Sequence, residues 1–399
     1  MPNQIYLDHS ATTPVDEAVF RAMKPYFMKN YGNPSSLHAL GQTAFNAVTE
    51  ARENTAEFLN CEAKEIIFTS GATEADNLAI FGLVDALRKN SSSRLHIITS
   101  SIEHPAVLEP FKKLESQGVE VTYLPVQANG IISLETFKKA VKNNTVFVSI
   151  MYVNSETGII EPIKEIGGVI EKINQARVEQ GNKNKIYFHT DAVQAVNFLN
   201  CDVKFLKVDL LSLSGHKIYG PKGIGALFVK SGTPVLGQQL GGHHEGNLRS
   251  GTLNVPGIAG LGQAVKICAR DKEKNNKKIL KLRNKFVSEL KRRVADIKVN
   301  TDLPNSTPAH ANVSFVGAEG EAVLIALDLE GVAVSTGSAC ASESLRASPV
   351  LTAMGVKEEI SHSTIRFTFG KANTEAEVKR VLKLLPPIVK RFRQMAPEL

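Results

Sequence analysis

Short apolar runs rich in β-branched and aromatic residues alternate with longer stretches of helical period through much of this 399-residue chain. The longer stretches space their apolar residues as an amphipathic helix does. This alternation predicts an α/β domain over roughly residues 15–255, in which helices cover both faces of a mostly parallel, seven-stranded sheet. The runs expected to form strands are "EIIFTS", "LHIITS", "EVTYLP", "TVFVSIMYV", "KIYFHTD", "DLLSLS" and "IGALFV".

The pattern changes after residue 255. A long, charged helical stretch is followed by separated strand-like pieces and by a terminal helix that two prolines interrupt. This predicts a smaller α+β domain of residues 256–399 together with residues 1–14, and the first dozen residues are expected to pack against one of the two domains. The strand-like pieces are "HANVSFVG", "GVAVST" and "TIRFTFG", and the terminal helix is "EAEVKRVLKLLPPIVKRF".

The composition is that of a globular protein with an ordinary core, since 43% of the residues are hydrophobic and the net charge is +7. The basic excess falls in two late helical stretches that are not interleaved with aromatic residues. Such stretches are typical of solvated helix faces rather than of a nucleic-acid groove, and they leave an acidic protein partner open. No apolar run reaches the roughly 18 residues of a membrane span, and the N-terminus lacks a secretory leader. We therefore expect no nucleic-acid binding, no membrane association and a cytoplasmic location.

The cysteines are scattered and form no CxxC pair, so neither a disulfide framework nor a structural zinc site is predicted. Three of them stand in mixed apolar surroundings and are expected to be buried or incidental. His243 and His244 are adjacent, and adjacent side chains on a strand point to opposite faces, so we expect no metal site there. The four cysteines are Cys61, Cys201, Cys268 and Cys340.

Residues suited to catalysis follow several of the predicted strands, where ligands bind in such sheets. "GATEADN" follows the first strand, and this helix N-terminus can hold a phosphate or simply be capped. His104 follows the second strand, where a lone histidine is more often structural than catalytic. Asp191 and Gln194 follow "KIYFHT". The turn "SGHKIYGPKGIG", with Lys217 and Lys222, follows the next strand.

One cofactor uses all of these groups. Pyridoxal phosphate (PLP) has an aldehyde that a lysine can bond, a ring nitrogen that a carboxylate keeps protonated, and a phosphate. Two rival interpretations of the glycine-rich turn fit less well. The turn approaches the phosphate-loop pattern, but Pro221 intrudes and no hydroxyl residue follows Lys222, and GxGxxG after an early strand is absent. Lys217 is nearer the strand end and is the better candidate for the PLP bond.

A series of motifs extends this interpretation to a family. In their order and approximate spacing they resemble the cysteine desulfurases of the NifS/IscS type, which are class V members of the PLP fold-type I superfamily. The resemblance runs from about residue 4 to about residue 395, and its most specific parts are "SGHKIYGPKGIG" and "GSAC". The motifs are "YLDHSATTPVDEAV", "YGNPSSLH", "FTSGATEADNLAI", "EHPAV", "HTDAVQ", "SGHKIYGPKGIGAL", "LRSGTLN", "STGSACAS" and "IRFTFG".

The resemblance implies roles for individual residues. Lys217 would bond covalently to PLP, His104 would stack on the ring and move protons, Asp191 would pair with the ring nitrogen, and Gln194 would bond the ring hydroxyl. Arg366 would bind the substrate carboxylate, although it could also be a surface arginine on a strand. Cofactor contacts are further expected at Ala72, Thr73, Ser155, Ser214, His216 and, from the other subunit of a homodimer, Thr252, and substrate contacts at Asn33 and Asn154.

Cys340 stands in "STGSACASESLRASP", a stretch without apolar period that predicts a mobile loop and an exposed, reactive thiol. The resemblance implies that its thiolate takes the sulfur of L-cysteine as a persulfide and releases L-alanine. It further implies delivery of the sulfur to an iron–sulfur scaffold protein or another acceptor, for cluster assembly or tRNA thiolation. The chain departs from the family pattern at Ser155, where asparagine is usual, and around His243 and Asn247.

Two other hypotheses stay open at this point. A selenocysteine lyase or an aminotransferase would share the fold, and an aminotransferase needs no loop cysteine. A non-catalytic sulfur-relay scaffold is suggested only by Ser155, and it predicts a protein whose PLP spectrum ignores L-cysteine.

Overall fold

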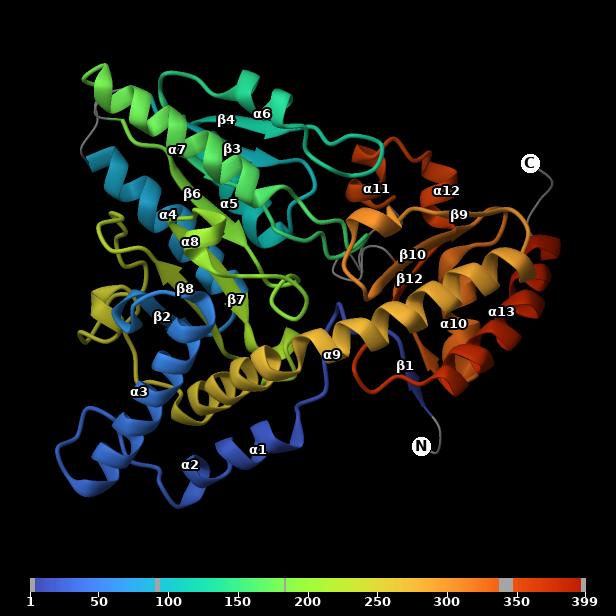
Figure 1. The fold of residues 1–399 in the computed structure, drawn as a ribbon, viewed down its shortest axis with the longest axis horizontal. Helices are drawn as coiled ribbons and strands as arrows, with labels where there is room; N and C mark the ends of the chain where they lie inside the picture. Colours follow the sequence, from blue (N-terminus) through green and yellow to red (C-terminus); the bar gives the residue numbers. More distant parts are fainter. Residues whose placement is uncertain (1–3, 90–93, 183, 337–346, 396–399) are drawn as a thin grey trace.

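The computed structural model describes residues 4–89, 94–182, 184–336 and 347–395 (Figure 1). Its largest sheet consists of β2 (Ile66–Thr69), β3 (His96–Ser100), β4 (Glu120–Leu124), β5 (Thr145–Ser149), β6 (Tyr187–Asp191), β7 (Leu210–Ser214) and β8 (Gly225–Val229). The strand order is β2-β8-β7-β6-β5-β3-β4. β8 is antiparallel to both of its neighbours, and all other adjacent strands are parallel. The mostly parallel seven-stranded sheet expected from the sequence is therefore confirmed.

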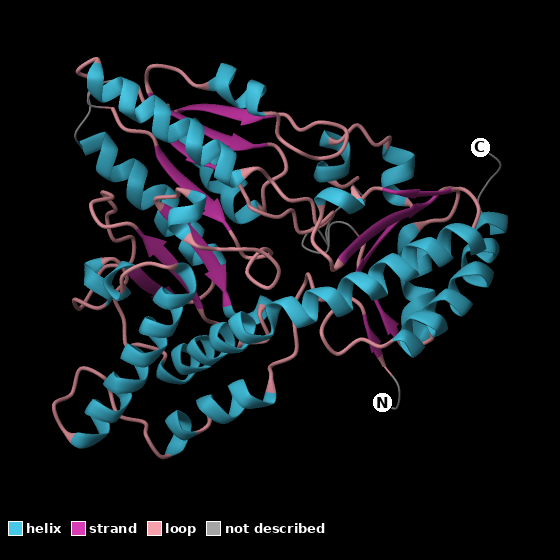
Figure 2. Cartoon of the chain, in the orientation of Figure 1, coloured by secondary structure: helices cyan, strands magenta, loops and turns pink. Residues whose placement is uncertain are grey.

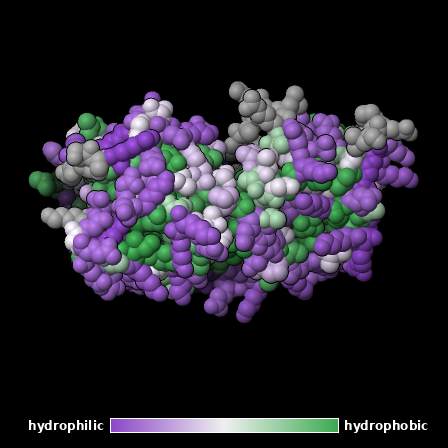
Figure 3. Space-filling view, turned by 90° about the horizontal axis from the view of Figure 1, so that it is seen from above, coloured by the Kyte–Doolittle hydropathy of each residue, from purple (hydrophilic) through white to green (hydrophobic). Residues whose placement is uncertain are grey.

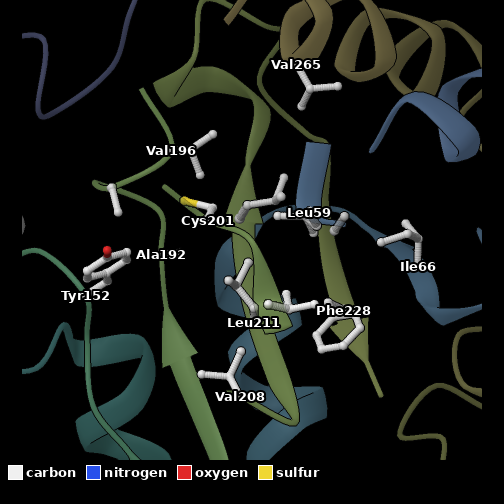
Figure 4. Packing of buried hydrophobic residues seen from close by; sticks show 14 of the residues in the cluster. Leu59, Ile66, Tyr152, Ala192, Val196, Cys201, Val208, Leu211, Phe228 and Val265 are labelled. Carbon is white, nitrogen blue, oxygen red and sulfur yellow. The ribbon is translucent and has the colours of Figure 1, made fainter. Parts of the chain in front are cut away.

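Helices cover both faces of this sheet (Figure 2). Along β7, Leu210 packs with residues of α4 and α5, whereas Leu211 packs on the opposite face with residues of α3, α6, α7 and α9. This alternation is the two-residue period of a strand that is buried on both sides. Figure 4 shows Leu211 among the buried residues on the face covered by α3, α6, α7 and α9, close to Phe228 of β8. The helices are α3 (Ala39–Leu59), α4 (Ala72–Lys89), α5 (Pro105–Ser116), α6 (Leu134–Ala140), α7 (Ile163–Glu179) and α9 (Val255–Arg293).

The helix α9 spans 39 residues and links two hydrophobic cores. Its buried residues as far as Cys268 belong to the core under the large sheet, and those from Ile279 onward belong to a second core in the C-terminal region. In Figure 1 it runs from the large sheet across to the C-terminal strands. A continuous helix thus connects the two parts of the molecule.

The second core lies between small sheets and helices. β9 (Ile297–Val299), β10 (His310–Phe315) and β12 (Thr364–Thr368) form an antiparallel sheet of order β12-β10-β9. β1 (Ile5–Tyr6) pairs in parallel with β11 (Val332–Ala333), so the N-terminal strand joins this region. All three strand-like pieces expected from the sequence contain strands. The helices α10 (Gly320–Leu329) and α13 (Glu375–Met395) pack with them.

The terminal helix α13 differs from the sequence expectation, because it continues through Pro386 and Pro387. Leu385 and Val389 are buried on either side of the prolines, and this packing holds the segment against the second core. The remaining helices are short: α1 (Glu17–Met23), α2 (Pro25–Met28), α8 (Val203–Leu206), α11 (Pro349–Ala353), α12 (Glu358–His362), and the 3-10 turns η1 (Ala63–Glu65), η2 (Gly215–Lys217), η3 (Glu245–Asn247) and η4 (Leu303–Asn305).

The surface is mixed in character. Figure 3 shows hydrophilic residues interspersed with hydrophobic ones over the face seen from above. Within the described ranges, every helix is too short or too polar to cross a membrane.

Candidate active site

The carboxyl ends of β2, β3, β5, β6 and β7 meet at one edge of the large sheet, because only β8 runs the other way. Asp191 ends β6 and Ser214 ends β7. α4 begins at Ala72, just after β2, and His104 caps the start of α5, just after β3. Residues that are far apart in the sequence are therefore brought to the edge where such sheets bind ligands.

Asp191 is buried, and its Oδ1 accepts a hydrogen bond from the N–H of Val193 at 2.9 Å. Burial raises the pKa of the Asp191 carboxyl, and the positive charges of His104 and Lys217 lower it. Asp191 ends β6, and the neighbouring strand β7 leads into the turn that carries Lys217, so the two residues come from adjacent strand ends. A cationic ring nitrogen bound here would stabilise the ionised form of Asp191.

Lys217 ends the turn η2, and its Nζ donates hydrogen bonds to the carbonyl oxygens of Ser10 at 2.5 Å and Ala11 at 2.7 Å. The turn requires glycine at position 215, where a Cβ would lie 2.9 Å from the Ile224 side chain. Lys222, the other candidate, is exposed. Of the two lysines, Lys217 is the one whose charge acts on Asp191.

The start of α4 offers N–H groups that a helix cannot use internally. Ala72 is half-buried there and Thr73 is exposed, while β8 approaches so closely that a Cβ at Gly225 would lie 2.8 Å from the backbone of Gly71. Ser214 is buried at the end of β7. His216 Nδ1 lies 3.1 Å from the hydroxyl oxygen of Thr12, and the pKa of His216 falls to about 4, mainly through burial and then through the charges of the neighbouring lysines.

The hydrogen bonds of His104 and Gln194 define which of their atoms face the site. His104 Nδ1 accepts the N–H of Ala106 at 3.1 Å, so the neutral ring carries its proton on Nε2. Gln194 Nε2 donates to the carbonyl oxygen of Ser10 at 2.9 Å. His104 thus leaves Nε2 for exchange with a ligand, and Gln194 leaves its carbonyl oxygen.

Arg366 is 4% exposed in β12, so it is not a surface arginine. Its Nη1 donates to the carbonyl oxygen of Ser155 at 3.1 Å, and its Nη2 donates to Asp8 Oδ1 at 2.9 Å. Its Nε is buried without a hydrogen-bond partner. An unpaired buried donor costs free energy, and a bound carboxylate would remove that cost.

Three other predicted residues, Asn154, Ser155 and Asn33, have hydrogen bonds within the protein. The Asn154 side chain is fully buried, and its Oδ1 accepts the N–H groups of Glu156 and Thr157, so it builds a turn. Ser155 contributes its carbonyl oxygen, which also accepts the Ser10 hydroxyl at 2.6 Å. Asn33 is exposed between α2 and α3, and its Oδ1 accepts the N–H of Ser35.

The loop before α9 carries the remaining predicted residues. Thr252 is exposed there, and among the described contacts none joins it to the strand-end residues. The expectation of a strand at His243 and His244 is wrong, because both lie in the loop that leads into η3. His243 Nδ1 lies 2.6 Å from Asn247 Oδ1, and His244 Nδ1 lies 3.1 Å from the carbonyl oxygen of Gly242. The described residues contain no group of three or more metal-binding side chains.

The sequence reasoning missed the segment of residues 8–13, which we call the crossing segment. It was expected to pack against one domain, but it contacts Arg366 from the C-terminal region and also Gln194, His216 and Lys217 from the large sheet. Its bonds to Gln194 and Lys217 are accepted by the backbone carbonyl oxygens of Ser10 and Ala11, which leave no signal in the sequence. Further bonds use side chains of "YLDHSATT", namely the Asp8 carboxylate and the hydroxyl groups of Ser10, Thr12 and Thr13.

Ionisable groups are also buried behind the strand ends. Glu103 accepts the Ser100 hydroxyl at 2.5 Å and the N–H of Met151 at 2.9 Å, and burial raises its pKa to about 8. Asp76 of α4 is completely buried, with His189 Nε2 at 3.5 Å, and burial raises its pKa well above the ordinary value. Sequence reasoning missed both acids, since an acid in a helix or turn is ordinarily exposed.

The thiols within the described ranges are poor nucleophiles. Burial raises the pKa of Cys61 and of Cys201 to about 12 and that of Cys268 to about 11. At neutral pH these thiols stay protonated, and the thiolate is the reactive form. Cys340, the predicted nucleophile, lies outside the described residues.

These residues fit PLP by their chemistry. Lys217 supplies an amine, Asp191 supplies a buried carboxylate at the neighbouring strand end, and the start of α4 supplies N–H groups that the helix does not use internally. Arg366 supplies a buried cation with a donor to spare.

Comparison with known proteins gives matches over the full length. The family described as Aminotransferase class-V matches residues 5–381. "Cysteine desulfurase IscS" of Dictyoglomus turgidum is 44% identical over 397 residues, which covers 100% of this chain and 97% of that protein. The protein of the same name from Methanosarcina thermophila is 46% identical over 393 residues, with 98% and 94% covered.

Two solved structures extend the likeness to the fold. A "NifS-like protein" superposes with a TM-score of 0.87 at 36% identity, covering 98% of this chain and 100% of that one. "SspA in complex with cysteine" superposes with a TM-score of 0.78 at 36% identity, covering 93% and 100%.

Proposed function

This chain belongs to the aminotransferase class-V family, and from that premise we propose how its residues release sulfur from L-cysteine. The activity is that of a PLP-dependent cysteine desulfurase that mobilises sulfur. The observation that carries the assignment of roles is the placement of Asp191, His104 and Lys217 after strand ends at one edge of the large sheet, with Arg366 held at the other end of the crossing segment.

We propose that Lys217 forms the covalent bond to PLP and that Asp191 holds the ring nitrogen protonated. The bound cofactor then supplies a ring that stabilises negative charge at the substrate α-carbon. Lys217 Nζ and His104 Nε2 hold or move the protons of the reaction, and the carbonyl groups of Ser10 and Ala11 support this lysine. Gln194 faces the ring hydroxyl. The phosphate is held by Ala72, Thr73, Ser214 and His216, with Ser155 as a further cofactor contact.

On the substrate side, we propose that Arg366 binds the carboxylate of L-cysteine. Its unpaired Nε supports this role, because a buried N–H group without a partner can donate a hydrogen bond to a carboxylate. Asn154 and Asn33 remain proposed substrate contacts. Asn154 acts through the turn that places Ser155, and Asn33 lies in an exposed loop.

We propose that Cys340 is the sulfur acceptor. Its thiolate attacks the substrate sulfur, so that an S–S bond forms while the C–S bond breaks. The electron pair of the C–S bond stays with the carbon, which takes up a proton and leaves as L-alanine. The raised pKa values of the three described thiols support this choice, because they disfavour every other cysteine as the nucleophile.

The test measures alanine and sulfide from L-cysteine plus a reductant, for the PLP-loaded wild type, Cys340→Ala and the control Cys61→Ala. We expect alanine from the wild type and the control and almost none from Cys340→Ala. Equal alanine from Cys340→Ala and the wild type would remove Cys340 from the chemistry. A pyridoxamine form that accumulates with other amino acids would instead favour an aminotransferase, and a PLP spectrum that ignores L-cysteine would favour the scaffold hypothesis.

We also propose a homodimer, with Thr252 reaching the partner's phosphate site. Large apolar side chains gather on α1, α2 and the start of α3, and a soluble monomer rarely exposes so many together. Light scattering of the holoenzyme measures the mass directly. The exposed side chains are Phe20 (53%), Phe27 (57%), Met28 (85%), Tyr31 (67%), Leu37 (92%) and Phe45 (50%).

We propose two domains, residues 15–255 and residues 1–14 with 256–399, and a cytoplasmic location, where thiols are kept reduced. The sulfur acceptor is proposed to be an iron–sulfur scaffold protein or a tRNA-thiolation partner. The support is the similarity to proteins named IscS.

A further inference from the structure

Asp8 is the carboxylate that contacts the proposed substrate-binding arginine. Its Oδ1 accepts a hydrogen bond from Arg366 Nη2 at 2.9 Å, although the two residues are 358 positions apart in the chain. The side chain of Arg366 is 5% exposed and that of Asp8 is 17% exposed. The ion pair is therefore largely shielded from water. Away from water the attraction between the two charges is strong, and removal of one charge leaves the other without a partner.

Asp8 is held in place by its neighbours. β1 pairs with β11 up to Tyr6, and the Tyr6 hydroxyl donates to the carbonyl oxygen of Asp8 at 2.9 Å. The N–H of Ser10 donates to the Thr368 hydroxyl, also at 2.9 Å. The carboxylate thus approaches Arg366 from a backbone fixed on both sides.

Three other ionisable groups of the described residues interact with Arg366. One is Tyr6, whose pKa is raised to about 12 by burial and then by Asp8, against the opposing charge of Arg366. Glu156 is buried and its Oε2 accepts the Ser348 hydroxyl at 2.6 Å; burial raises its pKa to about 7, against the opposing effect of Arg366. His310 is completely buried, and burial followed by the charge of Arg366 lowers its pKa to about 3. His310 is therefore neutral at pH 7. Among the carboxylates of the described ranges, Asp8 is the one that forms an ion pair with Arg366.

A guanidinium has five N–H donors. In Arg366 one is used by Asp8 and one by the carbonyl oxygen of Ser155, and Nε has no partner. A substrate carboxylate can therefore bind while Asp8 stays in place. Two carboxylates on one guanidinium repel each other at short range, so the second binds less tightly than it would to a free arginine.

We propose that Asp8 is a positioning residue that fixes the guanidinium of Arg366 and weakens its hold on carboxylates, so that the product L-alanine leaves readily. The inference rests on the proposed role of Arg366 as the carboxylate site. Product and substrate share this carboxylate, and tight binding of both lowers KM without raising kcat.

The experiment compares PLP-loaded wild type with Asp8→Asn, which keeps the shape of the side chain and removes its charge. Binding of L-alanine is followed through the PLP absorbance without turnover, and L-alaninamide, which lacks the carboxylate, serves as the control ligand. We expect about tenfold tighter alanine binding and unchanged alaninamide binding. KM and kcat for L-cysteine should fall together as product release slows.

Two further variants separate the effect of the Asp8 charge from other effects of the substitution. Asp8→Glu should restore alanine affinity toward that of the wild type. Asp16→Asn removes a carboxylate that pairs with Lys371, elsewhere in the N-terminal region, and should change neither ligand. Alanine binding that is unchanged or weaker in Asp8→Asn would overturn the proposal. If Arg366→Lys also leaves alanine binding unchanged, Arg366 does not bind the carboxylate, and the proposed role of Arg366 is wrong.

Discussion

The two halves of the active site are built in different ways. The cofactor half comes from one sheet, whose neighbouring strands end at the same edge and deliver Asp191 and Ser214 through a continuous ladder of backbone hydrogen bonds. The proposed substrate half consists of Arg366 and Asp8, which belong to opposite ends of the chain and whose side chains meet in one ion pair. The crossing segment joins the halves, because it also contacts Lys217.

Because of this difference, the two halves should respond differently to amino-acid substitution. A strand end in a buried parallel sheet is fixed by many bonds, so one substitution there changes chemistry more than position. In the substrate half the guanidinium of Arg366 bonds Asp8 and the carbonyl oxygen of Ser155, so one substitution at Asp8 changes the orientation of the group proposed to hold the substrate. Cofactor binding and substrate binding should therefore be separable by mutation.

The largest effect is expected in the cofactor half, from Lys217→Ala. Loss of the amine removes the covalent bond to PLP and a proton-transfer group, so alanine formation should fall on the order of 10³-fold. The control is Lys222→Ala, which changes an exposed lysine of the same turn and should stay within about twofold of the wild type. The assay is alanine release, with the PLP absorbance recorded in parallel. Equal losses in both variants would mean that the turn, rather than one amine, matters.

A smaller effect is expected in the substrate half, from Arg366→Lys. A lysine replaces a two-pronged donor by a point charge, so kcat/KM for L-cysteine should fall about 30-fold, mainly through KM. The PLP absorbance without substrate should be unchanged. Arg293→Lys, at an exposed arginine paired with Glu289, is the matched control. If Arg366→Lys also lost PLP, the two halves would not be separable.

The smallest effect concerns the free energy of unfolding, and it arises from Glu103, which is buried behind the strand ends of the cofactor half. Glu103 has its pKa raised from 4.5 to about 8 by burial, so between these values the folded state keeps a proton that the unfolded state releases. Its contribution therefore makes the protein less stable as pH rises from about 4.5 to about 8. Glu103→Gln should remove this dependence, gaining on the order of 3 kcal/mol relative to the wild type between pH 5 and pH 8.

Urea unfolding of the apoprotein at several pH values measures the gain from Glu103→Gln. The exposed Glu53→Gln on α3 is the control, and it should follow the wild type at each pH. Parallel pH curves for wild type and Glu103→Gln would show that Glu103 is already ionised in the folded state.

Much of the cofactor half could be predicted from the sequence, because strand runs reveal their own ends. The seven strands are confirmed, and with them the common edge that carries Asp191, Ser214 and the turn of Lys217. The two-residue period of a strand is a local property, which a single chain displays without its neighbours.

The substrate half could not be predicted in the same way. Asp8, the ion-pair partner of Arg366, is 358 positions away, and the carbonyl oxygens that bind Lys217 belong to the backbone, so a local sequence pattern shows neither contact. The loop at His243 and the unbroken helix through Pro386 were missed because tertiary packing, not local pattern, decides them.

The ion pair between the two chain ends also means that its two residues are synthesised at different times. During synthesis at about 5–20 residues per second, Asp8 leaves the ribosome roughly 20–70 s before Arg366. The last strand of the large sheet ends at Val229 and the α9 residues of its core end at Cys268, so both precede the C-terminal strands in the chain. The residues proposed to bind the cofactor are therefore synthesised well before Arg366, the residue proposed to bind the substrate.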